Sequence, residues 1–211
     1  SGASIKSNGA GGLSTLMLRG GGSSHTSIIW NGLNIQSPMS GSTDFSIFPV
    51  NMFSSVKLQY GGSGTLFGSG AVAGVVHLSS GNLLTMPNGS SVTLGLGSAN
   101  SKSSLVSIKD GNSRVAASFK LFTLESDNDY EFYNSTKKDS PKEFISNAEV
   151  SQLGIAADIA LRLSKSTSWS LASWYQNSDK NLQTRMSNLT PDSSNQKDNQ
   201  IYTSSNLKFI K

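Results

Sequence analysis

The sequence LMLRGGGSSHTSIIWNGLNI, residues 16–35, and the sequence FPVNMFSSVKLQYGGSGTLFGSGAVAGVVHLSS, residues 48–80, decide the fold of this chain. In both, short apolar runs alternate with glycine-rich segments, which is typical of short strands joined by turns. Asn31 and Gly32 separate two apolar runs, and this dipeptide is a strong β-hairpin signal because both central residues of the turn need a positive φ. The front third of the chain therefore predicts short strands linked by irregular backbone, with a short turn or helix at residues 47–53 and strands at 56–60 and 75–78.

The composition supports a β-rich protein and excludes several function classes. Of the 211 residues, 36% are hydrophobic and only 14% are charged, while Gly, Ser, Asn and Thr are abundant, which argues against a helical bundle and a charged disordered tail. The net charge of +4 is scattered, with no basic run beyond Lys137 and Lys138, so we expect no nucleic-acid partner. The absence of cysteine excludes a disulfide scaffold and a thiolate metal site.

From Ser91 onward the sequence changes to longer segments of two-residue alternation, of which we count about six. In residues 152–163 the odd-numbered side chains from Leu153 to Leu163 are mostly large and apolar, whereas the even-numbered ones are polar or small. Tilted at roughly 40°, this segment covers about 25 Å, the height of the apolar band of a membrane barrel. The connections alternate in size, with short ones at 98–102, 109–113 and 163–168 and long ones at 127–147 and 179–199, which fits the short periplasmic turns and long extracellular loops of outer-membrane barrels.

The same alternation also fits a soluble or surface-anchored β-sandwich that acts as a binding module, because one face of each sandwich sheet is buried and the other is wet. In that alternative, Ile155 and Leu161 would pack into a dry interior shared with a second sheet. In a barrel they would instead face lipid.

Four motifs carry a resemblance to a known family, and they lie at 18–20 (Leu-Arg-Gly), 29–32 (Ile-Trp-Asn-Gly), 60–62 (Tyr-Gly-Gly) and 66–76 (LFGSGAVAGVV). Together they resemble the later part of the plug domain of a TonB-dependent outer-membrane receptor. The loop Ser40-Gly41-Ser42-Thr43-Asp44 is most similar to the cobalamin-receptor branch. The chain departs from the family at Asn31, where Asp is usual, and at residues 60–62, where Arg-Gly-Pro is usual.

The resemblance implies a mainly β fold in which residues 1–81 are the C-terminal part of the plug and residues 82–211 are the first antiparallel strands of a transmembrane β-barrel. About 22 strands cannot fit after Gly81, and the earlier plug with its TonB-binding segment is absent, so we expect a fragment of such a receptor. The receptor would be a transporter of the bacterial outer membrane that captures a scarce nutrient, such as cobalamin or a siderophore, and passes it through the plugged barrel. Its partners would be the TonB energy-transducing complex, outer-membrane lipid and that nutrient.

By position in the family pattern, the outward-facing plug loops lie near residues 13–15, 21–23 and 36–41. Small residues and free backbone N–H groups there would let a bulky polar molecule approach closely. The residues expected to approach the nutrient are Leu13, Thr15, Gly22, Ser40 and Gly41.

No catalytic constellation or cofactor motif emerges, so we expect no enzyme and no cofactor. Residues 68–73 match G-x-G-x-x-A, but a strand-like segment follows them and supplies no helix N-terminus for a phosphate. His25 and His77 stand apart from other ligand residues and are expected to be hydrogen-bonded within the plug. Residues 127–131 alternate oxygen-bearing side chains, which leaves a calcium ion in this loop as an alternative to a solvated loop.

Overall fold

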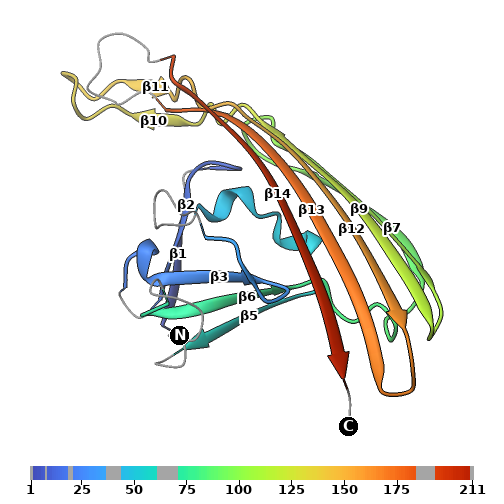
Figure 1. Cartoon of the computed structure of the whole chain (residues 1–211). Helices are drawn as coiled ribbons and strands as arrows, with labels where there is room; N and C mark the ends of the chain where they lie inside the picture. The colour runs from blue at the N-terminus through green and yellow to red at the C-terminus, as the bar shows by residue number, and fades with distance from the viewer. Residues whose placement is uncertain are drawn as a thin grey trace.

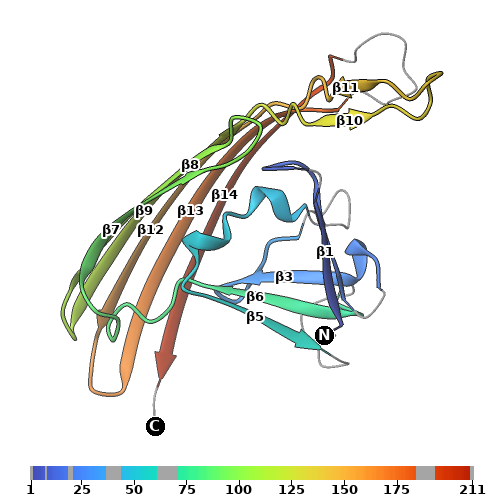
Figure 2. The same ribbon diagram turned by 180° about the vertical axis from the view of Figure 1, so that it is seen from behind.

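The structure is a computed structural model that describes residues 2–7, 9–18, 21–36, 44–60, 71–183 and 193–209. Two parts lie against each other (Figure 1). We call the part before residue 82 the plug, and the large six-stranded sheet that follows it the wall. Figure 2 shows the plug lying on the concave side of the curved wall. No helix among the described residues has the length and apolar character needed to span a bilayer.

A four-stranded mixed sheet forms the centre of the plug. Its strand order is β4-β3-β6-β5, with β3 parallel to β6 and the other neighbours antiparallel. The bounds of these strands are β3 Thr26–Trp30, β4 Leu33–Asn34, β5 Ser55–Tyr60 and β6 Gly74–Ser79. The predicted hairpin is confirmed, because β3 and β4 are joined by Asn31 at φ 46° and Gly32 at φ 89°. Both residues thus have the left-handed backbone that this turn requires.

Short helical turns and a second hairpin complete the plug. The 3-10 turns are η1 Ser23–His25, η2 Phe45–Ile47 and η3 Val50–Met52, so the predicted turn or helix at 47–53 is confirmed as two such turns. β1 (Ala3–Ser7) pairs antiparallel with β2 (Ser14–Leu18). The sequence gives no sign of β1, since Ile5 is its only large apolar residue and is exposed to solvent.

The wall is an antiparallel sheet in the order β14-β13-β12-β9-β8-β7. Its strands are β7 Gly89–Leu96, β8 Lys102–Gly111, β9 Val115–Ser126, β12 Val150–Arg162, β13 Thr167–Asn181 and β14 Asn195–Phe209. Neighbouring strands in the sheet are consecutive in the chain, apart from the excursion between β9 and β12. The six strands agree with the count from alternation.

The two faces of the wall differ as the alternation predicted. Even-numbered residues of β13 from Ala172 to Lys180 are buried toward the plug, whereas the odd-numbered ones lie on the opposite face. Register continues this opposite face across the sheet, since Ile159 pairs with Ala117 and with Leu171. Exposed apolar residues on it are Val92, Leu94, Leu96, Ile108, Val115, Phe119, Ile159, Ile201, Leu207 and Phe209. Ile155 and Leu161 share this face, and no second sheet among the described residues covers it, so the sandwich alternative is wrong.

The connections of the wall lie at two distinct ends. Residues 112–114 and 163–166 turn at one edge, here called the turn end, while residues 127–149 connect strands at the other, here called the loop end, where β13 also ends and β14 begins (Figure 1). The short connection at residues 97–101 lies at the loop end too, because Leu96 pairs with Lys102 beside the end of β9, so short and long connections are not fully separated as predicted. The second long connection is shorter than predicted, because β13 extends to Asn181 and β14 begins at Asn195, both through polar residues. The first, between β9 and β12, covers residues 127–149 and is slightly longer than predicted. Inside the first long loop, the hairpin of β10 (Glu131–Tyr133) and β11 (Lys142–Phe144) escaped prediction.

Candidate functional site

Plug and wall share one hydrophobic core. Trp174 of β13 is fully buried and its ring lies 5.3 Å from that of Phe53, 5.5 Å from Phe48 and 5.9 Å from Trp30, all three in the plug. Tyr202 of β14 packs beside it, with 5.4 Å between ring centroids. Tilted and edge-to-face contacts of this kind add to the free energy of apolar burial. The centre of the interface is therefore closely packed.

A charged contact joins plug and wall at the loop end. Asp44 of the plug forms an ion pair with Lys180 of β13, whose side chain is only 5% exposed. The other carboxylate oxygen of Asp44 accepts hydrogen bonds from the backbone N–H of Ser14, at 3.0 Å, and of Ser46, at 2.9 Å. Burial by itself raises the pKa of Asp44, but the hydrogen bonds from Lys180, Ser14 and Ser46 outweigh it and hold the pKa below its ordinary value. Asp44 is thus ionised at neutral pH and ties two plug segments to the wall.

Two side-chain amides of the wall make further contacts with plug backbone at the loop end. Gln152 of β12 donates to the carbonyl oxygen of Ser46 at 3.0 Å. Asn128, just beyond β9, both accepts from the N–H of Ala10 at 3.1 Å and donates to its carbonyl oxygen at 2.9 Å. The β1–β2 connection of the plug is therefore held against the start of the first long loop.

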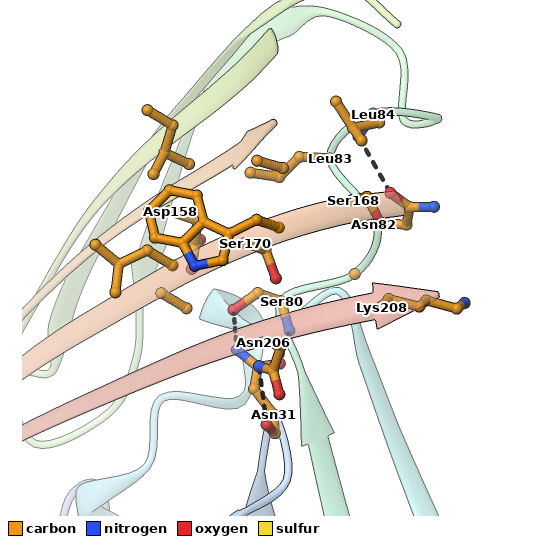
Figure 3. Close-up of a pocket in the computed structure, with 16 residues that line it drawn as sticks. Asn31, Ser80, Asn82, Leu83, Leu84, Asp158, Ser168, Ser170, Asn206 and Lys208 are labelled. Atoms are coloured by element: carbon orange, nitrogen blue, oxygen red, sulfur yellow. Dashed lines mark hydrogen bonds between the residues drawn. The ribbon is translucent and has the colours of Figure 1, made fainter. Parts of the chain in front are cut away.

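The interface is hollow toward the turn end. A pocket of about 240 Å³ lies between the end of the plug, at Ser80 and Gly81, and β12 to β14 of the wall (Figure 3). Polar Asp158, Asn206 and Lys208 line it together with apolar residues such as Leu83 and Leu84, so its surface is mixed. Beside it, Ser204 donates a hydrogen bond to the carbonyl oxygen of Asn31 at 3.1 Å. Dense packing at the centre thus gives way to open space near this edge of the wall.

The predicted nutrient-facing residues are only partly brought together. Leu13 and Thr15 flank Ser14 at the start of β2, next to Asp44, and Leu13 is exposed. Gly22 lies at the other end of β2, because the N–H of the preceding Gly21 donates to the carbonyl oxygen of Leu18 at 2.8 Å. Ser40 and Gly41 lie outside the described residues. So do Arg19 and residues 61–70, which belong to the motifs at 60–62 and 66–76.

The residues that actually join plug and wall escaped the sequence analysis. Trp174 stands on the even-numbered, mostly polar face of β13, where an aromatic ring is unusual unless something covers it, whereas Lys180 on the same face looks like an ordinary exposed lysine. That pattern was the available signal. Asp44 stands in the sequence as the last residue of a polar loop, and nothing distinguishes Asn128 from other loop asparagines.

Both histidines make hydrogen bonds within the plug. His25 accepts a hydrogen bond from the N–H of Gly22 at 3.2 Å, and a ring nitrogen of His77 lies 2.7 Å from the side-chain oxygen of Gln59, as expected for hydrogen-bonded plug residues. Within the described ranges, no three His, Cys, Asp or Glu side chains gather in a metal-binding arrangement. Asp127 instead accepts a hydrogen bond from Asn100 at 3.0 Å.

Comparison with known proteins agrees with this architecture. Residues 1–75 match the TonB-dependent Receptor Plug Domain family. Over 70 residues, or 33% of the chain, the sequence is 30% identical to the vitamin B12 transporter BtuB of Vibrio vulnificus, of which it covers 11%. The chain thus spans about a tenth of the length of this curated relative.

Solved structures share the fold over most of the chain. The copper transporter OprC superposes with a TM-score of 0.67 over 85% of this chain and 27% of its own, at 17% identity. The siderophore receptor PirA from Acinetobacter baumannii gives a TM-score of 0.63 over 84% of this chain and 28% of its own, at 19% identity. Receptors with this plug are transporters of the bacterial outer membrane, not enzymes. Residues 1–75 therefore match a TonB-dependent receptor plug domain, and the antiparallel strands that follow share the fold of the barrel strands in these solved structures.

Proposed function

We propose that the chain belongs to a receptor that captures a scarce nutrient at the loop end and passes it through the plugged barrel. The observation that carries this proposal is the two-faced wall, with an apolar outer face and an inner face that buries Trp174 and Lys180 against the plug. A plugged membrane barrel needs an apolar face toward lipid and a second face packed on the plug, whereas a soluble sheet would leave the outer apolar face in water.

The division into domains is part of the proposal. We assign residues 1–81 to the plug and residues 82–211 to the barrel strands. Supporting this boundary, Gly81 has φ 85° and its N–H is bound to the hydroxyl of Ser79, where β6 ends. Residues 82–88 then lead to the first wall strand.

The energy and the surroundings would come from partners common to such receptors. Transport would depend on the TonB energy-transducing complex pulling on the plug, with outer-membrane lipid around the apolar outer face. The interface offers a route for this rearrangement, because it is packed around Trp174 but already open beside Asp158.

The nutrient is proposed to be cobalamin, a siderophore or a similarly bulky polar molecule. The local identity to the vitamin B12 transporter favours the cobalamin branch, and the fold is equally compatible with siderophore receptors. We propose Leu13, Thr15, Gly22, Ser40 and Gly41 as the plug residues that approach it. Leu13 and Thr15 have the stronger support, since they lie where the plug meets the loop end of the wall.

Uptake by whole cells tests the function. A strain lacking the gene should lose uptake of one radiolabelled probe among cyanocobalamin, ferric siderophores and copper, and the gene should restore it. Uptake should stop when TonB is deleted or a protonophore is added. If the restored strain accumulates none of these probes in an energy-dependent manner, the proposed function is contradicted.

Point variants test the proposed ligand side. Leu13→Arg puts a long cation at the loop end and should weaken binding of the transported probe. Val56→Arg is the matched control, because Val56 is a comparably exposed apolar plug residue, on β5. Equal loss of uptake in both variants would remove Leu13 from the site.

A further inference from the structure

Asn128 occupies an unusual position between plug and wall. Its side chain is 1% exposed and is fully hydrogen-bonded. Besides the two bonds to Ala10, its amide donates to the carbonyl oxygen of Ala148 at 3.0 Å and its oxygen accepts from the hydroxyl of Ser126 at 3.1 Å. One side chain therefore bonds to the plug and to both stems of the first long loop.

Few other residue types could take this position. Asn128 has φ 51°, in the left-handed region that Asn, Asp and Gly tolerate best. Its amide combines two donors with an acceptor, so it can satisfy the N–H and the carbonyl of Ala10 at once. An ionised Asp would present only acceptors to the carbonyl oxygens of Ala10 and Ala148, and Gly would present nothing.

The contact leaves no slack between plug and loop. A Cβ atom added to Gly9 would lie 2.8 Å from the side-chain oxygen of Asn128. On the loop side, the N–H of Ile145 donates to the carbonyl oxygen of Tyr130 at 3.0 Å and closes the stem on which β10 and β11 stand. Hydrogen bonds thus link Ala10 to Asn128, and the stem of the hairpin closes only two residues further along the backbone, at Tyr130.

We propose that Asn128 is a positioning residue that fixes the spacing between the plug apex, residues 9–13, and the β10–β11 hairpin, so that the two move as one unit. Building on the proposed function, this unit would present the apex and the long loop to the nutrient in a constant geometry. A preset geometry lowers the ordering cost of binding.

Distance measurement between two spin labels tests this without any nutrient. These 211 residues contain no cysteine, so Leu13→Cys and Tyr133→Cys, both at exposed sites, give a single labelled pair once any cysteine elsewhere in the gene product is replaced by serine. In the complete gene product in outer-membrane vesicles, we expect one narrow distance distribution. Asn128→Asp should broaden it about twofold or more, because the apex can then move independently of the loop.

Asn147→Asp is the matched control. Asn147 also has a left-handed backbone, at φ 56°, and sits in the same loop, but its amide donates to the carbonyl oxygens of Leu182 and Ser194 in the other long loop. This variant should leave the distribution narrow. Hydrogen exchange at the Ala10 amide should accelerate about tenfold in Asn128→Asp and remain unchanged in the control.

An unchanged distribution in Asn128→Asp, or equal broadening in the control, overturns the proposal. If Asn128→Asp fails to assemble, Asn128→Gly carries the test, because glycine accepts the same backbone conformation. No nutrient is present in these measurements, so a failed uptake screen and a rigid spacing in Asn128→Asp are separate outcomes.

Discussion

Asp44 of the plug and Lys180 of the wall, separated by 136 positions in the chain, form an ion pair at the loop end of their interface. The lysine is almost fully buried, while the carboxylate retains some exposure. Removing the carboxylate would leave a buried cation without its partner, which costs far more than loss of a surface pair.

Asp44→Asn should therefore loosen the plug. We expect a destabilisation of about 3 kcal/mol, the lower end of the range for breaking a buried pair, because Asp44 is not fully buried. Urea unfolding, detected by the protease sensitivity of the plug, measures this destabilisation. Lys197→Met is the control, since the pair of Lys197 with Asp179 is largely exposed and should contribute at most about 1 kcal/mol.

The same carboxylate predicts an acid dependence. The pKa of Asp44 is lowered in the folded protein, so its stabilising contribution is complete above the unfolded value, 3.8, and is lost as the pH falls through the folded pKa. Between pH 7 and pH 5 the Asp44-dependent part of stability should stay constant, and it should decline only below about pH 4. Melting curves of the wild type and Asp44→Asn across this range test it. A difference between them that already shrinks near pH 6 would contradict the assignment.

Trp174→Ala should be among the most damaging substitutions in the wall. Its ring fills the space between Phe48 and Phe53, and removing a large buried side chain typically costs about 3–5 kcal/mol. Trp169→Ala, on the outer face of the same strand, is the comparison and should cost less. The loss of stability in both variants can be measured from the temperature at which the electrophoretic mobility of the assembled protein changes. Similar losses in the two variants would mean that Trp174 is not the centre of the shared core.

Two glycine substitutions separate backbone strain from plug–wall contact. Gly11 at φ 63° and Gly32 at φ 89° both have left-handed backbone, so alanine at either costs about 1 kcal/mol. A Cβ at Gly11 would also lie 2.5 Å from Cγ1 of Val150, whereas at Gly32 nothing lies within 4 Å. Gly11→Ala should therefore destabilise the protein more in chemical unfolding. Equal effects would indicate that the apex does not touch the wall.

The free-energy cost of a charge on the outer face of the wall should depend on its depth in the bilayer. Ile159→Arg places a charge in the middle of the apolar face and should cost about 2–4 kcal/mol in a bilayer. Ser151→Arg, on the same face of β12 but near the loop end, should cost less than about 1 kcal/mol. Titration with urea of folding into lipid vesicles compares the free energies of folding of the two variants. If both variants fold equally well, this face does not meet lipid at the depth assumed.

Much of this fold was predictable because its signals are local. The turn at Asn31 and Gly32 depends on two adjacent residues, and the faces of β12 follow from alternation within one segment. β1 and the β10–β11 hairpin were not predictable in this way, since they bury little apolar surface. Likewise, polar extensions of β13 and β14 are held by ladder hydrogen bonds that leave no mark on hydropathy.

The candidate site was less predictable, because its contacts are distant in the chain. Asn128 and Ala10 are separated by 118 positions, and no pattern in either segment announces the other. Trp174 stands out in the sequence as an aromatic ring on a mostly polar face, but nothing in the sequence says which residues cover it. Leu13 and Thr15 came from the resemblance alone, and their role stays a prediction.

The plug contributes Leu18, Ile28, Trp30 and Phe48 to a core that is completed by Leu105, Phe122, Ala172 and Trp174 of the wall. Neither part can therefore bury all of its apolar side chains by itself. An excised plug would expose these apolar side chains to water and lose the packing that fixes its short strands.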